Sequence, residues 1–424
     1  MAIEAPLPPE QRQPLLVVGE ALSRYSGLVR FVVRFPWMLV AAGGLMSARM
    51  TASITGDLIR FARAGDWLVH GDLAAIYAGS WMQGGPFELI FSYGLLPAPR
   101  QHVAQYYIAS EGHLIGLHAV LGVALMLCLL WGVKHLRCGV GLARSRNLEF
   151  AVGLVALLDL LPKLMWQGGH PAEIGIAAFW IWAGSLAVRG RPTRAAIVIG
   201  LSTGWEPWGL LAAGLLLTDR RPRQLLLNGA VFAVSAVLPY VPFVLTGHFA
   251  LFDLTWPIAH GTLISVIWPH ASSFTWLMRL IQGAGSSMAA GAVVLALGRR
   301  RDTVWLAPLA ALIVRLLCDP LDLGYYWHPL LLLSLVGVGF LHGSCSLSRV
   351  SGVLALAYVP GLYLSARLPW VNGDVLLFAA LVLVVVLVVL IRREDPESLG
   401  RSPSELGSSR ARKDSNPEAG NGSS

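Results

Sequence analysis

A run of polar side chains follows the first apolar segment of the chain directly. Residues 56–86 read GDLIRFARAGDWLVHGDLAAIYAGSWMQGGP, with Asp57, Arg60 and Gln83 among several charged or hydrogen-bonding residues. A carboxylate held outside lipid can act as a general base that accepts the proton of an attacking hydroxyl group. Asp57 is the first residue of an expected helix, where the helix dipole favours the ionised carboxylate. The same position suits an ordinary helix N-cap, so the sequence allows Asp57 to be either a general base or only a helix cap.

A second polar cluster lies near the C-terminal end of the apolar region, where residues 315–329 read RLLCDPLDLGYYWHP. An arginine near the end of an apolar helix either faces the interior of the bundle or extends to the membrane surface. A guanidinium facing inward is well suited to hold a lipid-linked phosphate. The candidate ligand-binding residues of this cluster are Arg315, Asp319, Tyr325, Tyr326 and His328.

Three shorter segments add further candidates. His170 stands in the turn WQGGHPAE, which could be only a turn, and His260 stands in a tryptophan-rich loop over 247–279. Trp205 and Glu206 interrupt an apolar segment immediately before Pro207. Aromatic rings interleaved with hydrogen-bonding groups suit the faces of sugars, although tryptophan also marks the membrane interface in any protein.

The composition indicates a polytopic membrane protein. Of 424 residues, 55% are hydrophobic and 13% are charged, and the mean hydropathy is +0.62. The net charge of +8 comes from 32 basic and 24 acidic residues. The basic residues form short clusters between apolar segments, which is typical of topology signals, and so nucleic acid is not an expected partner. We predict an all-α transmembrane helical bundle of about 10–12 spans.

The expected elements follow from hydropathy. After an N-terminal segment over 1–30, the membrane domain occupies 31–391, and a disordered tail occupies 392–424. Residues 86–97 are too few for a span and are expected to be re-entrant or interfacial. The segment 195–218 is expected to be a hairpin of two half-helices broken at 204–207. The predicted apolar segments are 31–47, 113–133, 148–166, 171–189, 195–218, 224–246, 280–298, 303–317, 326–342, 350–366 and 374–391.

The polar stretch itself should begin with an amphipathic helix lying in the membrane interface. Its apolar face would be Leu58, Phe61, Gly65 and Leu68, and its polar face Asp57, Arg60, Ala64 and Trp67. The basic clusters place both termini in the cytoplasm and the candidate residues on the outer face. Asp159 and Lys163, four residues apart in an apolar segment, are expected to neutralise each other.

The polar stretch and the C-terminal cluster together resemble a known family. The order GDLxxFxxAG at 56–65, GDLxxIY at 71–77 and QxGP at 83–86 after a first membrane helix is similar to the GT-C class of integral membrane glycosyltransferases. Within that class it resembles the bacterial mannosyltransferases that use polyprenyl-phosphate sugars, and RLLxDP followed by paired tyrosines resembles the same family. The resemblance implies a GT-C fold, and Asp57 matches the family's catalytic base.

The resemblance implies transfer of mannose or another sugar from a polyprenyl-phosphate donor to a lipid or glycan acceptor on the outer face of the plasma membrane. Asp57 would be the catalytic base, and no metal or other cofactor is expected. The stereochemistry implied by the family is inversion. The predicted ligand-binding residues are Arg60, Gln83, His170, Trp205, Glu206, His260, Arg315, Asp319, Tyr325, Tyr326 and His328.

Two other classes of function are compatible with the pattern. Broken helices and charges within apolar segments also mark secondary transporters, although charges are sparse in the middle of the segments and no inverted repeat is evident. An inactive scaffold of cell-envelope assembly would have the same composition. The sequence leaves open which sugar is moved and which acceptor receives it.

Overall fold

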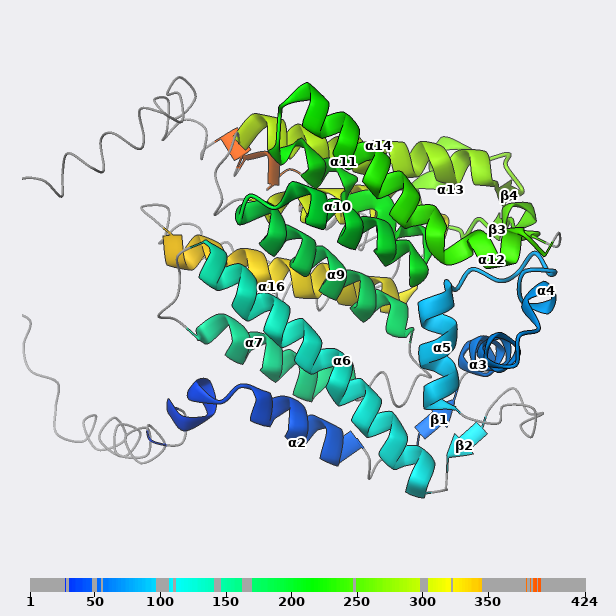
Figure 1. Ribbon diagram of the computed structural model, residues 1–424, viewed down its shortest axis with the longest axis horizontal. Coiled ribbons are helices and arrows are strands. Elements are labelled where there is room, and N and C mark those ends of the chain that lie inside the picture. The colour runs from blue at the N-terminus through cyan, green and yellow to red at the C-terminus, as the bar shows by residue number, and fades with distance from the viewer. Residues whose placement is uncertain are drawn as a thin grey trace, which may run out of the picture.

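A computed structural model shows a mostly helical chain. It describes residues 30–47, 52–54, 56–96, 107–109, 112–140, 146–161, 170–246, 249–297, 304–321 and 323–344, with Gly27 and isolated positions between 379 and 389. The longer helices run side by side (Figure 1). They are α2 (Trp37–Ser47), α6 (Gly112–Gly139), α7 (Asn147–Val155), α9 (Pro171–Val188), α10 (Pro192–Leu201), α11 (Pro222–Val237), α14 (Trp276–Leu297), α15 (Leu306–Leu317) and α16 (Trp327–Ser344).

Four helical stretches among the described residues are long and apolar enough to cross a membrane. They are Ala119–Gly139, Pro171–Val188, Pro222–Val244 and Trp276–Leu297. The third joins α11 to η5 (Leu238–Tyr240) and α12 (Val241–Val244). Shorter apolar helices cover Leu148–Leu158, Pro207–Thr218, Leu306–Leu317 and Trp327–Gly337. The expectation of a mostly helical protein is therefore confirmed, with four stretches that could cross a membrane, while the polytopic bundle and the number of spans stay predictions.

Two of the predicted segments differ in the structure. The segment 31–47 is interrupted at Phe35 and Pro36, because proline cannot donate the backbone hydrogen bond that continues a helix. The predicted segment 113–133 is shorter than the helix it corresponds to, since α6 continues to Gly139. Arg137, expected in a cytoplasmic loop, lies in the last turn of α6 and is buried against Glu149, with Nη2 and Oε1 2.8 Å apart.

Short elements gather at one end of the bundle, at the right in Figure 1. They include α3 (Gly56–Val69), α4 (Leu73–Ile76) and α5 (Pro86–Leu95). Two strand pairs also lie there, β1 (Ala52–Ile54) with β2 (Tyr107–Ala109) and β3 (Trp256–Pro257) with β4 (Ser273–Phe274). Both pairs are antiparallel, with Ser53 opposite Ile108 and Trp256 opposite Phe274. Further short elements of the chain are η2 (Ala156–Leu160), which follows α7, and η6 (Leu251–Asp253), α13 (Leu263–Ile267) and η8 (Gly324–Tyr326).

The expected amphipathic helix is α3, and it packs closely on α5. Leu58, Phe61 and Gly65 face the interior, and an added Cβ at Gly65 would lie 2.2 Å from the Leu89 carbonyl oxygen of α5. Only glycine therefore allows the two helix backbones to approach this closely. Ala64, expected on the polar face, is buried instead. At ten residues α5 is about 15 Å long, half of a hydrocarbon core, and so it does not span one.

The segment 195–218 has the predicted break. α10 ends at Leu201, a short turn η3 (Ser202–Gly204) follows, and η4 (Pro207–Thr218) begins after Glu206. Pro207 occupies the first position of η4, where the absence of an N–H leaves no partner unsatisfied. The Ser202 hydroxyl donates to the carbonyl oxygen of Gly209 at 2.8 Å. This contact closes the turn and directs η4 back along α10.

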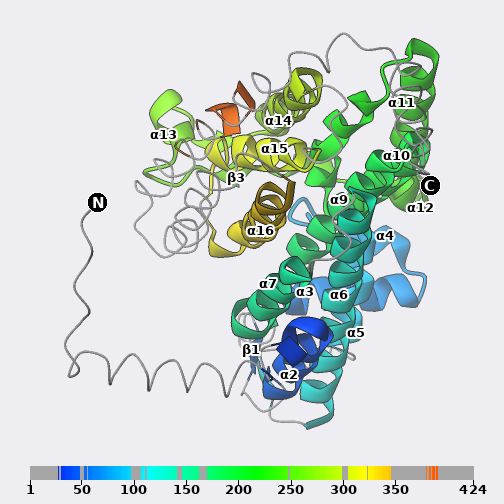
Figure 2. The same cartoon turned by 90° about the vertical axis from the view of Figure 1, so that its left-hand side faces the viewer.

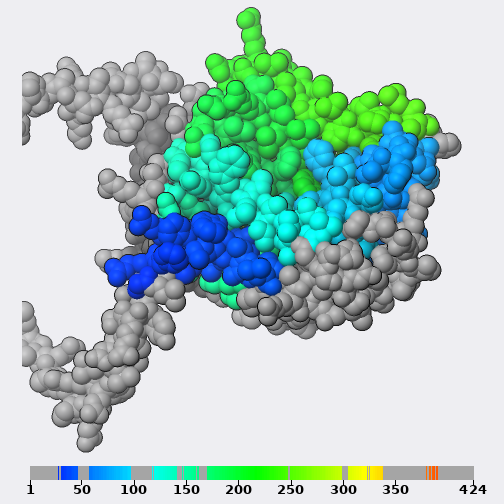
Figure 3. Space-filling model, turned by 60° about the horizontal axis from the view of Figure 1, so that its bottom comes forward, coloured from blue at the N-terminus to red at the C-terminus, as the bar shows by residue number. Residues whose placement is uncertain are grey.

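The second half of the chain packs α15 between α14 and α16, as seen from the other direction in Figure 2. On the face drawn in Figure 3, the unit of α3 and α5 lies against α6. The hydrophobic core is built mainly from α6, α9, α15 and α16, with a contribution from η4. Four predictions concern residues or side chains that lie wholly or largely outside the described part of the chain. They are the segments 350–366 and 374–391, the tail over 392–424 and the Asp159–Lys163 pair.

Candidate active site

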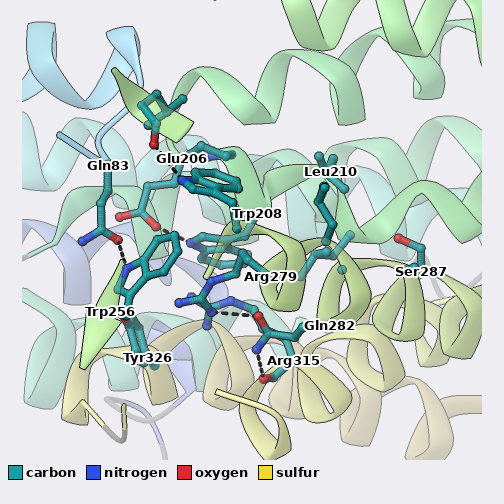
Figure 4. A pocket seen from close by; sticks show the side chains of 17 residues that line it. Gln83, Glu206, Trp208, Leu210, Trp256, Arg279, Gln282, Ser287, Arg315 and Tyr326 are labelled. Atoms are coloured by element: carbon teal, nitrogen blue, oxygen red, sulfur yellow. Dashed lines mark hydrogen bonds between the residues drawn. The ribbon is translucent and has the colours of Figure 1, made fainter. Parts of the chain in front are cut away.

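A pocket of about 250 Å³ lies where η4, α14 and α15 meet the elements at the end of the bundle (Figure 4). Its walls come from segments far apart in the sequence, which the fold brings together. The lining residues are Gln83, Glu206, Pro207, Trp208, Leu210, Leu211, Leu251, Trp256, Trp276, Arg279, Leu280, Gln282, Gly283, Ala284, Ser287, Arg315 and Tyr326.

Two arginines form the floor of the polar end of this pocket. Arg279 Nη1 lies 2.9 Å from Asp319 Oδ2, and Arg315 Nη2 lies 3.9 Å from the same oxygen. A single carboxylate thus faces two guanidinium groups. Arg315 is 3% exposed, and its Nη1 has no hydrogen-bond partner among the residues that the structure describes. Of the two alternatives for Arg315, the structure therefore favours the bundle interior.

Aromatic rings hold both guanidinium groups in place. The Arg315 Cζ atom lies 4.2 Å from the ring centroid of Trp208 and 4.6 Å from that of Tyr326. The Arg279 Cζ atom lies 4.3 Å from the ring of Trp256. Cation–π contacts of this kind stabilise a desolvated arginine without using its N–H donors. Arg279 Nη1 donates to Gln282 and Asp319, whereas Arg315 Nη1 stays available to a ligand in the pocket.

Hydrogen bonds fix the polar groups on the opposite wall. The indole N–H of Trp256 donates to Gln83 Oε1 at 2.9 Å, and the indole N–H of Trp208 donates to Glu206 Oε2. Figure 4 shows Gln83 and Glu206 at the same end as the arginines. Flat indole faces next to an amide and a carboxylate match the alternation of apolar faces and hydroxyl groups on a sugar.

The other end of the pocket is apolar and open. Leu210 and Ser287 lie away from Gln83 and Trp256 in Figure 4. Leu280 both lines the pocket and is 63% exposed on the outer surface of α14. Leu277, Ile281 and Met288 extend the same exposed apolar surface. The pocket therefore connects a charged end with a surface that suits acyl or isoprenoid chains.

Beside the polar end lies a compact acidic cluster, which we define as Glu88, His170 and Glu206. One ligand atom from each residue lies within 4.8 Å of the other two. Glu88 is fully buried in α5, and neither of its carboxylate oxygens has a hydrogen-bond partner in the described part of the chain. Its surroundings include the backbone N–H of Ala172 at the start of α9, outside hydrogen-bond geometry.

Burial raises the pKa of both carboxyl groups of the acidic cluster. For Glu88, burial and then the negative charge of Glu206 raise the pKa well above its ordinary value. For Glu206, burial raises the pKa to about 7, although Arg315 and the Trp208 N–H favour the ionised form. Glu173, next to both, is also fully buried.

His170 connects the acidic cluster to Asp57. Its ring stacks on Tyr325 with centroids 3.7 Å apart and an interplanar angle of 13°. Its Nε2 lies 3.9 Å from Asp57 Oδ2, and its Nδ1 is buried without a partner among the described groups. Burial lowers the pKa of His170 to about 4, against the opposing effect of Asp57. The imidazole is therefore neutral at physiological pH.

Asp57 stands at the margin of the site. It is the second residue of α3, and its side chain is 52% exposed. Arg60 Nη1 lies 3.8 Å from Asp57 Oδ1, and the Arg60 side chain extends outward over the ring of Trp81. An exposed carboxylate next to a buried polar site can receive a proton from a group that arrives from solvent.

The structure brings most of the predicted residues together. Gln83, Glu206, Arg315 and Tyr326 line the pocket, and Asp319 lies directly behind it. Asp57, His170 and Tyr325 adjoin it through the acidic cluster. His328 is buried at the start of α16, next to the Tyr325–Tyr326 pair in sequence.

Three predicted residues lie elsewhere. Trp205 is buried in the core, where its ring contacts Phe87, Phe91 and the backbone of Gly175. Trp208, on the same segment, lines the pocket instead. His260 is exposed in a turn and lines no part of the pocket. Arg60 faces outward with Trp81.

Sequence reasoning missed Arg279, Trp208 and Glu88. Two of them carried a usable signal. Arg279 stands in the first turn of an apolar helix at the end that is otherwise poor in basic residues, and Glu88 is a lone carboxylate within the apolar run PFELIF. Ionisable groups in such places are functional candidates by default. Trp208 had no such signal, because the sequence alone does not show which of the neighbouring residues Trp205 and Trp208 faces a pocket.

Comparison with known proteins gives no relative: no family model matches the chain, and neither the curated proteins nor the solved structures contain a match.

Proposed function

We propose that the protein is an integral membrane glycosyltransferase that moves a sugar from a polyprenyl-phosphate donor to a hydroxyl acceptor on the outer face of the plasma membrane. One observation carries the proposal. The pocket has a buried arginine with an unpartnered N–H group at one end and an exposed apolar surface at the other. A lipid phosphate has this same division between a charged head and an apolar chain.

In this proposal the phosphate lies against Arg315 and Arg279, and the isoprenoid chain lies along α14. A guanidinium binds phosphate through directed N–H groups in one plane. The same cations stabilise the charge that develops on the phosphate when it leaves. The sugar then lies over the indole rings, where Gln83 and Glu206 can accept or donate hydrogen bonds to its hydroxyl groups.

The acceptor hydroxyl attacks the anomeric carbon of the donor as the bond to the phosphate oxygen breaks. Asp57 takes the hydroxyl proton, which its partial exposure on the outer side of the acidic cluster allows. Attack opposite to the departing phosphate inverts the anomeric configuration. Neutral His170, fixed on Tyr325, keeps a polar but uncharged group beside the base.

The test is sugar transfer by purified protein in detergent with radiolabelled polyprenyl-phosphate sugars and candidate acceptors. Transfer needs no sealed vesicle, whereas transport does, so activity in micelles separates the enzyme from a transporter. Asp57→Asn should lower the rate by about 100-fold or more, the usual effect of losing a general base. Asp72→Asn, an exposed aspartate of the same region, should keep full activity.

Two results would contradict the proposal. Absence of transfer with every donor, in protein shown to be folded, would remove the enzyme assignment. Equal losses in Asp57→Asn and Asp72→Asn would mean that only the charge of the region matters.

A further inference from the structure

The acidic cluster has an unusual arrangement of charge. Glu88 and Glu206 approach each other inside the protein, and Glu173 adds a third buried carboxyl group next to them. Of the nearby cations, Arg279 and Arg315 already share Asp319. The local sum of charge is therefore negative when the glutamates are ionised. Burial of such a group requires a compensating cation or loss of the charge.

Protonation alone leaves the acidic cluster unsatisfied. A protonated Glu88 would have one O–H donor and a carbonyl acceptor, but neither oxygen has a described partner. The Nδ1 atom of His170 is also buried and without a partner in the described region. Buried polar atoms without partners are rare in folded proteins and call for a ligand that the protein atoms do not supply.

The geometry matches a metal ion. Each residue of the acidic cluster offers one atom, and the three atoms lie within 4.8 Å of one another. Ligands of a tetrahedral site about 2.1 Å from the metal lie about 3.4 Å apart, so the side chains need to approach by about 1 Å. Each glutamate has a terminal torsion that permits such a movement. His170 is otherwise fixed by its stack on Tyr325, which preorganises one ligand.

We propose that Glu88, His170 and Glu206 bind one divalent transition-metal ion, of the Zn²⁺ or Mn²⁺ type. An imidazole combined with two carboxylates favours these ions over Ca²⁺ and Mg²⁺, which prefer oxygen ligands alone. Glu206 then serves as a metal ligand as well as a pocket wall. This assignment differs from the metal-free site expected from the sequence, and it does not depend on sugar transfer.

The experiment measures metal binding by the purified full chain without any lipid-linked sugar. The protein is stripped with EDTA and titrated with Mn²⁺, and bound ion is counted by electron paramagnetic resonance and confirmed by elemental analysis. About one ion per chain is expected. Zn²⁺ should displace Mn²⁺ at the same stoichiometry, because Zn²⁺ binds such sites more tightly.

Two variants locate the site. Glu88→Gln removes one ligand charge, and His170→Phe removes the nitrogen ligand but keeps a ring that can stack on Tyr325. Each should weaken Mn²⁺ binding by about 100-fold or more, which exceeds the effect of losing a group that only supports a ligand. Asp72→Asn, an exposed acidic residue at the same end, should bind like the unmodified protein.

Thermal unfolding gives a second readout that does not rely on affinity. Metal should raise the unfolding temperature of the unmodified protein and leave that of Glu88→Gln unchanged, since a ligand that binds only the folded state stabilises it. Stripped Glu88→Gln should be at least as stable as the stripped unmodified protein, because a neutral amide replaces an unpartnered buried carboxyl group.

The proposal is overturned if the unmodified protein binds less than one tenth of an ion per chain at millimolar Mn²⁺ or Zn²⁺. It is also overturned if both variants bind as tightly as Asp72→Asn, since the ion would then lie elsewhere. Metal binding without sugar transfer would refute only the proposed enzyme function. Transfer by a protein that binds no metal would refute only the metal site.

Discussion

Replacement of Arg315 tests the proposed phosphate site of the pocket directly. Arg315→Lys keeps the positive charge but removes the planar pair of N–H donors, and it also loses the stacking on Trp208 and Tyr326. A hydrogen bond to a charged group contributes about 1.5–3 kcal/mol, which corresponds to about 10- to 100-fold in the dissociation constant. We therefore expect lysine to weaken binding of a polyprenyl-phosphate sugar by this factor, and Arg315→Gln by more.

The fold should survive this change. Asp319 keeps a partner when Arg315 is replaced, because Arg279 lies 2.9 Å from it. At Asp319 an uncompensated buried charge, the usual cause of a large loss of stability, is therefore avoided. A thermal unfolding temperature close to that of the unmodified protein would confirm that a loss of affinity is a binding effect.

Tryptophan fluorescence provides the assay. Trp208 and Trp256 line the pocket, so a bound ligand should change their emission, and titration yields the dissociation constant. Arg221→Lys is the matched control, since Arg221 is an exposed arginine that makes a two-pronged contact with Asp219 away from the pocket. If Arg315→Lys and Arg315→Gln both bind donor within twofold of the unmodified protein, Arg315 does not hold the phosphate.

Two other predictions follow from packing and topology. Gly65→Ala should destabilise the protein by about 1–3 kcal/mol, because its Cβ would overlap the backbone of α5. An added Cβ at Gly229 would have no atom within 4 Å, so Gly229→Ala should instead stabilise α11 by about 1 kcal/mol. Thermal unfolding of both variants checks that the unfolding temperature falls for Gly65→Ala and rises for Gly229→Ala. A cysteine at Asp72 should react with an impermeant thiol reagent in intact cells, and one at Ser408 should not, because the basic clusters place both termini inside. Labelling of the tail in unbroken cells would reverse the assignment of sides.

The sequence was most informative where local chemistry decides the outcome. The helix that begins at Gly56 and the break between Gly204 and Pro207 depend on periodicity and on proline, and both are present. The burial of Ala64 and the break at Pro36 were missed. The first depends on the contact with α5, which periodicity does not contain, and the second was hidden by high hydropathy on both sides of the proline.

The candidate site was predicted where one short segment supplied the residues. Arg315, Asp319 and Tyr326 lie within one turn and one helix end, so their proximity followed from their spacing. Pairings between distant segments could not be inferred. Arg279 meets Asp319 across forty positions, and Gln83 meets Trp256 across 173. Such contacts depend on how helices pack, which a single sequence does not specify.

The opening of the pocket along α14 has a consequence for kinetics. Leu280 is exposed at the rim, so a ligand with an isoprenoid chain can enter from the side without leaving the hydrocarbon phase. Under the proposed function the encounter with the donor takes place in two dimensions, and the quantity that governs saturation is the mole fraction of donor in the membrane. At a fixed bulk amount of donor, added detergent or lipid should lower the rate by surface dilution. A Michaelis constant in molar units would then describe the micelle composition as much as the protein.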